Sequence, residues 1–401
     1  MSYEIIKKDN PDTMKVKPNL HNYDLMKNNF KWDDIHKELD FLPGGKLNLA
    51  YEAIDRHTLT DKKDKIALIW DGKNNIEEKY TFNDLSKLSN KFANCLTNLG
   101  ITKGDRVFTY LDRVPELYIS IIGILKTGGI IGPLFSAFGT EAIKDRLKDS
   151  GAKILITSPQ LLPNVDAVKK DLPDIEHIIV INKHNVPYSL KENEASYENI
   201  MKDVSDNYEI CQTDKEDFSI MHYTSGTTGK PKGAVHAHEA IVGHYATAKY
   251  VLDLHPGDLY WCTADPGWVT GTSYGIMGPW SNGVSQLGSE VGFSVSRWYH
   301  LIEKYKVTVW YTAPTAIRML MKYGKKEVDK HDLSSLRYIN SVGEPLNPEA
   351  VIWSKKTLGL PFHDNCWQTE TGCIQIANYP AQDIKPGSMG RPFLGVNAGL
   401  V

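Results

Sequence analysis

The sequence has few cysteines, and they are scattered along the chain. Its 401 residues include five cysteines, none of them in a Cys-x-x-Cys pair. A disulfide framework or a structural zinc site needs paired and regularly spaced cysteines, so we expect free thiols. Free thiols are typical of a reducing compartment, and the first residues lack the apolar core of a signal peptide. We therefore expect a cytoplasmic protein.

Long apolar runs and an excess of one charge are also missing. No window approaches the ~18 consecutive apolar residues that a membrane-spanning helix requires. The 46 Lys and Arg nearly balance the 49 Asp and Glu, for a net charge of −3. Such a balance gives no basic field to attract nucleic acid or an anionic membrane. We expect small-molecule partners, and neither nucleic acid nor a membrane.

Strand-like and helix-like segments alternate along most of the chain. The apolar spacing predicts strands at 66–70, 106–111, 130–134, 153–157, 218–223, 307–312 and 337–341. Helical spacing predicts helices at 81–99, 116–126 and 141–148, from 239 onward, and at 298–305. Alternation of this kind implies βαβ units and mainly parallel sheets, and 401 residues exceed the ~250–300 that one core supports. We expect an α/β protein with an extended wrap (1–45), a first lobe (46–210) and a second lobe with the binding site (211–401).

The most informative segment is Tyr-Thr-Ser-Gly-Thr-Thr-Gly-Lys-Pro-Lys-Gly at 223–233, directly after a predicted strand. Its glycines let backbone N–H groups turn inward, and its hydroxyls and lysines offer donors and positive charge to a polyphosphate. No Gly-Lys pair is followed by Ser or Thr, so the segment is not a Walker P-loop. The expected phosphate contacts are Thr224, Ser225, Gly226, Thr227, Thr228, Gly229 and Lys230.

Two later segments follow predicted strands and complete a pattern. They are Ser-Val-Gly-Glu-Pro-Leu-Asn-Pro at 341–348 and His-Asp-Asn-Cys-Trp-Gln-Thr-Glu-Thr-Gly at 363–372. Together with the 223–233 segment they resemble the adenylate-forming superfamily of acyl-CoA synthetases. The resemblance covers residues from about 47 to the end, and it implies two stacked βα lobes with a smaller β subdomain.

The resemblance also implies roles for individual residues. Glu370 is the expected Mg²⁺ ligand, because Mg²⁺·ATP needs a hard oxygen ligand, and the Thr369 hydroxyl is expected to contact the α-phosphate. These two residues are the catalytic candidates. The remaining expected ATP contacts are Gly343, Glu344, Pro345, Asp364, Asn365, Cys366, Trp367, Gln368 and Thr369.

The stretch at 261–275 resembles acetyl-CoA synthetases in particular. The expected acyl pocket is formed by Trp268, Val269, Thr270 and Trp367. An indole in a pocket removes the space that longer alkyl chains need, whereas a single methylene is discriminated by only ~1–3 kcal/mol. We expect acetate to be activated with ATP and passed to CoA, with propionate as the alternative acid. Thr270 is also the candidate CoA contact.

The sequence departs from the family pattern in three places. It ends soon after Gly387-Ser-Met-Gly-Arg-Pro, before the family's ribose-binding aspartate and small C-terminal domain with its catalytic lysine. We therefore expect this chain to bind adenylates but to turn over poorly, and a nucleotide-binding module without turnover is the alternative. Asp-Asn-Cys replaces the usual Asp-Thr-Trp at 364–366, and the basic CoA-binding stretch has no match.

Three histidines and one arginine have other expected roles. His236, His238 and His244 lie close together in sequence, but His-Glu-x-x-His is absent because residue 242 is Val. We expect surface or capping roles for these histidines. Arg318 matches a family position, and we expect a structural role for it.

Overall fold

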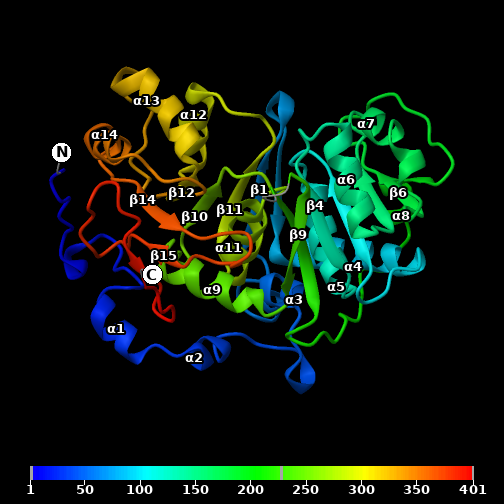
Figure 1. Ribbon diagram of the computed structural model, residues 1–401, viewed down its shortest axis with the longest axis horizontal. Helices are drawn as coiled ribbons and strands as arrows, with labels where there is room; N and C mark the ends of the chain where they lie inside the picture. Colours follow the sequence, from blue (N-terminus) through cyan, green and yellow to red (C-terminus); the bar gives the residue numbers. More distant parts are fainter. Residues whose placement is uncertain (1–2, 226–228, 400–401) are drawn as a thin grey trace.

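The computed structural model describes residues 3–225 and 229–399. Within these residues the strands form two mainly parallel sheets, one of nine strands and one of seven, with helices packed on both (Figure 1). The larger sheet has the order β16-β15-β14-β13-β12-β10-β11-β1-β2, and the smaller has the order β7-β6-β5-β3-β4-β8-β9. The prediction of an α/β fold with mainly parallel sheets is confirmed.

The strands range from two to eight residues in length. Their bounds are β1 Ile66–Asp71, β2 Glu77–Thr81, β3 Arg106–Tyr110, β4 Ile130–Leu134, β5 Ile154–Thr157, β6 His177–Val180, β7 Glu194–Ser196, β8 Phe218–Ser225, β9 Pro231–Ala237, β10 Leu259–Cys262, β11 Ser285–Ser289, β12 Val309–Thr312, β13 Tyr338–Ser341, β14 His363–Cys366, β15 Ile376–Ala377 and β16 Arg391–Pro392.

The helices range from single turns to five turns. Their bounds are α1 Tyr23–Asn29, α2 Trp32–His36, α3 Leu49–Ala53, α4 Phe82–Asn98, α5 Pro115–Lys126, α6 Thr140–Ser150, α7 Leu162–Asp166, α8 Tyr197–Met201, α9 Ala240–Tyr250, α10 Val269–Thr272, α11 Gly278–Ser281, α12 Val295–Tyr305, α13 Pro314–Val328 and α14 Pro348–Leu358. A single π-helical turn, Ser273–Met277, joins α10 to α11.

Helix α4 shows how local sequence defines an element. The Thr81 hydroxyl accepts a hydrogen bond from the Asp84 backbone N–H, and the Asp84 carboxylate accepts one from the Thr81 N–H. This capping box satisfies backbone donors that the first turn leaves unpaired. The helix ends before Gly100, whose φ of 84° is left-handed and suits glycine. The strands and helices expected from the alternation are present, with small shifts at their ends.

Each sheet takes strands from both sides of residue 210. β1 and β2 join the larger sheet because β1 pairs in parallel with β11. β8 and β9 join the smaller sheet because β8 pairs in parallel with β4. The antiparallel strands β15 and β16 extend the larger sheet beyond β14.

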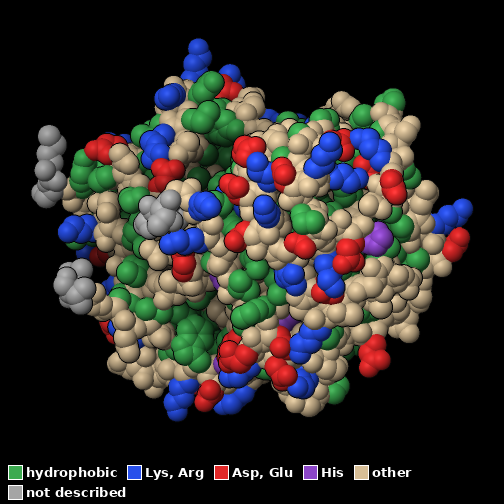
Figure 2. Space-filling model, turned by 45° about the vertical axis from the view of Figure 1, so that its right-hand side comes forward, with side chains coloured by type: hydrophobic (Ala, Val, Ile, Leu, Met, Phe, Trp, Pro, Cys, Tyr) green, Lys and Arg blue, Asp and Glu red, His purple; other side chains and the backbone are tan. Residues whose placement is uncertain are grey.

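The N-terminal residues wrap over the edge of the larger sheet, as the blue ribbon of Figure 1 shows. Ile6 pairs with Ile384 in an isolated antiparallel bridge. Phe30 and Trp32 pack against Phe393, with ring centroids 5.5 and 5.7 Å apart, respectively. None of the helices in the described part of the chain combines the length and apolar character needed to cross a bilayer. Acidic and basic side chains are interspersed over the face seen in Figure 2.

Candidate active site

A cavity of about 1040 Å³ lies where the parallel strands of the larger sheet end. Its walls come from the segments directly after β10, β12, β13 and β14, which supply residues 263–265, 312–316, 342–344 and 367–370. Ligands of open α/β sheets bind outside the carboxyl ends of the strands. The cavity therefore has the position expected of a binding site.

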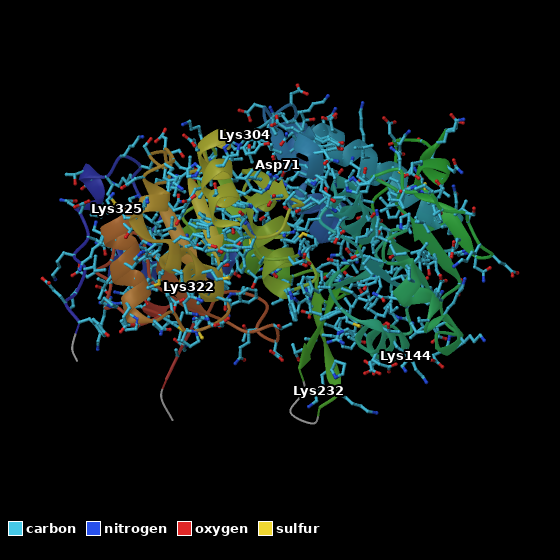
Figure 3. The ribbon with its side chains drawn as sticks, turned by 90° about the horizontal axis from the view of Figure 1, so that it is seen from above. Asp71, Lys144, Lys232, Lys304, Lys322 and Lys325 are labelled. Carbon is cyan, nitrogen blue, oxygen red and sulfur yellow. The ribbon has the colours of Figure 1, made fainter. Side chains whose placement is uncertain are left out.

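The smaller sheet contributes to the same cavity through Thr224, near the end of β8. This strand continues into an antiparallel hairpin with β9, in which Thr224 is paired with Lys232. Figure 3 shows Lys232 near the tip of this hairpin, which projects from the body of the molecule. Lys230 is exposed at the start of the return strand. Of the predicted phosphate loop, Gly226, Thr227 and Thr228 lie outside the described residues.

Two buried histidines hold the segment that carries Thr369 and Glu370. The Nε2 atom of His236, on β9, lies 2.6 Å from the carbonyl oxygen of Thr369. The Nε2 atom of His244, on α9, lies 2.9 Å from the carbonyl oxygen of Gly372. A carbonyl only accepts, so both rings must donate from Nε2–H. The two bonds fix the backbone on both sides of Glu370.

Burial keeps these histidines neutral. It lowers the pKa of His244 to about 3 and also lowers the pKa of His236. The expectation of surface roles is wrong for both, because local spacing does not reveal that β9 and α9 pack against residues 369–372. His238 is buried too, and its Nδ1 accepts a hydrogen bond from the N–H of Leu49, the first residue of α3. This contact is the capping role expected for one of the three.

Glu344 lies on the cavity wall in a fixed orientation. Its carboxylate accepts hydrogen bonds from the Thr315 hydroxyl at 2.8 Å and from the Arg318 guanidinium at 2.7 Å. The bond from Arg318 is the main reason that the pKa of Glu344 is lowered. Arg318 thus ties α13 to the loop after β13, in line with the structural role expected for it.

Asp364 and Asn365 lie behind the cavity and are buried. The Asp364 carboxylate accepts a hydrogen bond from the N–H of Leu346, and burial raises the pKa of Asp364 to about 6. Asn365 donates to the carbonyl of Ser341 and accepts from the Tyr311 hydroxyl. Both side chains therefore bind β14 to neighbouring elements of the sheet.

Two of the three tryptophans that line the cavity, Trp367 and Trp268, lie in different environments. Trp367 packs edge-on against Tyr274 of the π-helical turn, with ring centroids 5.1 Å apart. Trp268 is 45% exposed and contacts Phe135 and Phe138, which follow β4 of the smaller sheet. The Tyr274 hydroxyl accepts a hydrogen bond from the N–H of Ile374, which anchors the chain beyond residue 372. π-Helical turns occur frequently at functional sites.

The structure gathers ten of the predicted site residues around one cavity. Those that line it are Thr224, Trp268, Val269, Thr270, Gly343, Glu344, Trp367, Gln368, Thr369 and Glu370. Those described but not on its walls are Gly229, Lys230, Pro345, Asp364, Asn365 and Cys366. The backbone of Ser225 ends β8 directly after Thr224.

Sequence reasoning missed several lining residues. They include Thr263, Asp265, Phe293, Trp298, Thr312, Thr315 and Met319. Thr312 ends a predicted strand and its hydroxyl accepts a hydrogen bond from Thr263, so the rule that parallel strands end at the site offered a usable signal. Trp298 was expected to pack on the sheet, and its role as part of the wall had no local signal.

The oxygen groups on the walls suit a magnesium–nucleotide complex. Magnesium in such sites is bound by one or two carboxylates together with substrate phosphates, and Glu370 is an exposed carboxylate at the cavity. Within the described residues, no group of three or more His, Cys, Asp or Glu side chains is arranged to hold a metal by itself. The site fits a metal that arrives with its nucleotide.

Comparison with known proteins places this geometry in context. Residues 55–401 match the family model described as AMP-binding enzyme. An acetyl-coenzyme A synthetase of Bacillus subtilis (strain 168) is 48% identical over 385 residues, covering 96% of this chain and 66% of that protein. One of Methanothrix soehngenii is 41% identical over 377 residues, covering 89% of this chain and 56% of that protein.

A solved structure shows the same fold. The crystal structure of a Brucella canis acyl-CoA synthetase superposes with a TM-score of 0.85 at 31% identity, covering 92% of this chain and 66% of that one. The chain thus spans less than two thirds of the length of these relatives.

Proposed function

The chain belongs to the family of AMP-binding enzymes, and we propose that it is the part of an AMP-forming acid–CoA ligase that binds ATP and activates acetate. One observation carries the proposal. Thr224, beside the phosphate-binding segment, shares a cavity with Thr369, Glu370 and Trp367. The phosphate, metal and acid groups of the reaction then meet in one place.

The proposed first step is an in-line displacement at phosphorus. A carboxylate oxygen of acetate attacks the α-phosphate, the bond to the bridging oxygen breaks, and pyrophosphate leaves, which gives acetyl-adenylate. Such transfers require positioning and charge stabilisation more than covalent help. In the second step the CoA thiolate attacks the acetyl carbonyl and AMP leaves.

Individual residues receive proposed roles from their positions. Residues 224–230 are assigned to the β- and γ-phosphates from their sequence, with Lys230 supplying positive charge. Thr369 donates its hydroxyl to the α-phosphate, and Glu370 would hold Mg²⁺, whose charge would offset that of the phosphates. The hydrogen bonds from His236 and His244 to the two backbone carbonyls keep Thr369 and Glu370 in place while the α-phosphate is attacked.

Acid selection is proposed to depend on the tryptophans. Trp367 is fixed by its contact with Tyr274 and limits the depth available to an alkyl chain. A preference for acetate over butyrate follows from this steric limit. Acetate and propionate differ by a single methylene, which is worth only ~1–3 kcal/mol of discrimination. Thr270, on the same wall as Trp268, is the proposed contact for CoA.

Acid-dependent exchange of labelled pyrophosphate into ATP tests the proposal. Exchange should rise with acetate, less with propionate and least with butyrate, in the enzyme containing this chain. For the chain of 401 residues alone, calorimetry should show binding of ATP and of a non-hydrolysable acetyl-adenylate mimic. A chain that binds neither ligand while remaining folded would contradict the proposal.

A further inference from the structure

A second cavity lies at the opposite ends of the same strands. It has a volume of about 380 Å³ and is bounded by N-terminal residues 6–18 on one side and by residues 334–339 and 360–363 on the other. These last two segments contain the amino ends of β13 and β14, so this cavity is remote from the carboxyl-end site. Figure 1 shows the blue N-terminal chain running beside α14 and the red C-terminal segment.

The N-terminal wall is attached by specific contacts. Ile6 and Ile384 exchange two backbone hydrogen bonds of 2.9 and 3.0 Å. The side chain of Lys7 forms an ion pair with Asp383 at 2.6 Å. The adjacent residue, Lys8, extends its amine in another direction, toward β14. These contacts place Lys8 between the two walls of the cavity.

Lys8 has an unusual partner. Its Nζ lies 2.6 Å from Nε2 of His363, a buried side chain at the start of β14. The other ring nitrogen, Nδ1, lies 3.1 Å from the carbonyl oxygen of Ile339 and therefore carries the proton. His363 thus presents Nε2 as an acceptor and brings no negative charge to Lys8.

Three amines of this cavity lack an acidic partner. Among the described residues, no carboxylate oxygen lies within 4.0 Å of Nζ of Lys8, Lys15 or Lys355, all of which line the cavity. Arg337 differs, because its guanidinium is paired with Asp253 and Asp258. The cavity is lined by Lys7, Lys8, Lys15, Lys355 and Arg337 against Asp9 and Asp253, so positive charge is in excess here.

The charges around Lys8 come from every wall. The pKa of Lys8 is lowered to about 7, chiefly by burial and also by Lys355 of α14, while Asp9, Asp253 and Asp383 act in the opposite direction. The neighbouring His363 is neutral, since burial holds its pKa well below the usual range. A buried amine near like charge is stabilised in its protonated form when an anion binds beside it.

Part of the cavity is apolar. Ile6, Met14, Leu336 and Leu360 contribute to its walls. The volume falls in the ~300–1,000 Å³ range of small-molecule sites, which combine apolar walls with a few placed polar groups. A bare inorganic ion would leave most of this surface without contacts.

We propose that this cavity binds a small organic dianion, such as a phosphomonoester, with its charged group between Lys8, Lys15 and Lys355. Because one wall is the N-terminal segment and the other is the sheet, the bound ligand joins them. A ligand that binds only the folded state stabilises it in proportion to ln(1 + [L]/Kd). The site is separate from acid activation and does not depend on that function.

The sign of the pH dependence follows from Lys8. The dianion favours the ammonium form, so the pKa of Lys8 rises when the ligand binds. Above pH 7 binding must take up a proton, and at pH 8 only about one tenth of Lys8 is charged beforehand. Affinity should therefore fall by up to about tenfold between pH 6 and pH 8 for an anion of constant charge.

Calorimetry on the 401-residue chain tests the proposal with three probes at fixed ionic strength: inorganic sulfate, glycerol phosphate and succinate. We expect glycerol phosphate or succinate to bind at least several-fold tighter than sulfate, and the tighter of the two identifies the charged group. Sulfate keeps its charge between pH 6 and pH 8, so any change in its affinity over this range reports the protonation of Lys8. Equal affinity for sulfate and both organic probes would overturn the proposal.

Two variants show whether the ligand binds in this cavity. Lys8→Met should weaken binding at least tenfold, whereas Lys17→Met, which removes an exposed lysine paired with Asp12 and outside the cavity, should leave it unchanged. If Lys8→Met does not fold, ¹³C-lysine NMR of the unaltered chain gives the answer. The Lys8 resonance should titrate near pH 7 and shift to higher pH with ligand; no shift with any probe would overturn the proposal.

Discussion

At the scale of single residues, the proposed binding of acid and nucleotide depends on side chains that limit the space for the ligand or hold it in place. Trp367 is the clearest case, because it lines the cavity and packs edge-on against Tyr274. The sequence predicted its importance from the residues around it, and the geometry supplies a physical reason. The same scale includes His236, whose contact with Thr369 the sequence did not reveal.

Replacement of Trp367 by glycine should open the acid pocket. We expect Trp367→Gly to raise affinity for a butyryl-adenylate mimic relative to the acetyl mimic by about tenfold or more, since each methylene that finds space contributes ~1–3 kcal/mol. Calorimetry with both mimics measures the ratio. Trp353→Gly, a partly buried tryptophan of α14 outside the cavity, controls for general loosening. A folded Trp367→Gly chain with an unchanged ratio would refute the steric role.

His236 is proposed to position Thr369 and Glu370 through one hydrogen bond. His236→Leu removes the donor, and a lost hydrogen bond of ~1 kcal/mol corresponds to a roughly fivefold loss. We expect that loss in the extra affinity that Mg²⁺ gives to ATP binding, with AMP binding less affected. His236→Gln retains an N–H donor and should restore much of the effect. Equal losses for ATP and AMP, with no rescue by glutamine, would indicate a merely structural role.

The raised pKa of Asp364 predicts how the stability of the folded chain depends on pH. Burial raises the pKa of Asp364 to about 6 in the folded chain, above the ordinary value of 3.8. The folded state therefore binds more protons than the unfolded state between about pH 4 and 6, and this carboxyl makes stability fall as pH rises through that window. Asp364→Asn removes the titration, so its stability relative to the unaltered chain should increase by roughly 2–3 kcal/mol from pH 4 to 7.

Denaturant unfolding of both chains at several pH values measures this difference. A constant difference across the window would show that Asp364 does not titrate as proposed. Ser341 and Leu346 contact the same carboxyl, so the asparagine keeps an acceptor for the N–H of Leu346.

At the scale of elements, the loop of Gly267 and Trp268 joins the two sheets. Trp268 contacts Phe135 and Phe138 after β4, and Gly267 lies so close to this chain that a Cβ there would be 2.3 Å from the backbone nitrogen of Phe135. Backbone atoms cannot yield as a flexible side chain does. The close approach lets one cavity take walls from both sheets.

Gly267→Ala should therefore force the two sheets apart at this point. Overpacking of this kind costs ~1–3 kcal/mol or more, and the loss should appear in denaturant unfolding together with weaker nucleotide binding. Gly257→Ala is the matched control, because a Cβ at that exposed glycine meets no atom within 4 Å. If both variants lose stability equally, the close approach at Gly267 has no special role.

At the scale of the whole molecule, local sequence predicted the elements better than their partners. Helix α4 and strand β4 were predicted because spacing and caps are local signals. The pairing of β1 within the larger sheet and of β8 within the smaller sheet was not predicted, because strand pairing depends on residues far apart in the chain.

The difference between local and long-range signals also explains what the sequence predicted of the two cavities. The residues after β13 and β14 were predicted as part of the site because their motifs resemble those of the adenylate-forming superfamily. It gave no sign that Lys8 lies against His363, because 355 positions separate them. The burial of His236 and His244 was missed for a similar reason.

The central claim is that Thr224 and Thr369 contribute to one site that holds ATP for the activation of the acid. Calorimetric titration of the 401-residue chain with ATP and Mg²⁺ tests it most directly, using Thr224→Val and Thr369→Val beside the unaltered chain. We predict one binding site per chain and a loss of at least fivefold for each variant, since each hydroxyl donates to a charged phosphate at ~1.5–3 kcal/mol. Undiminished binding in both folded variants would contradict the account.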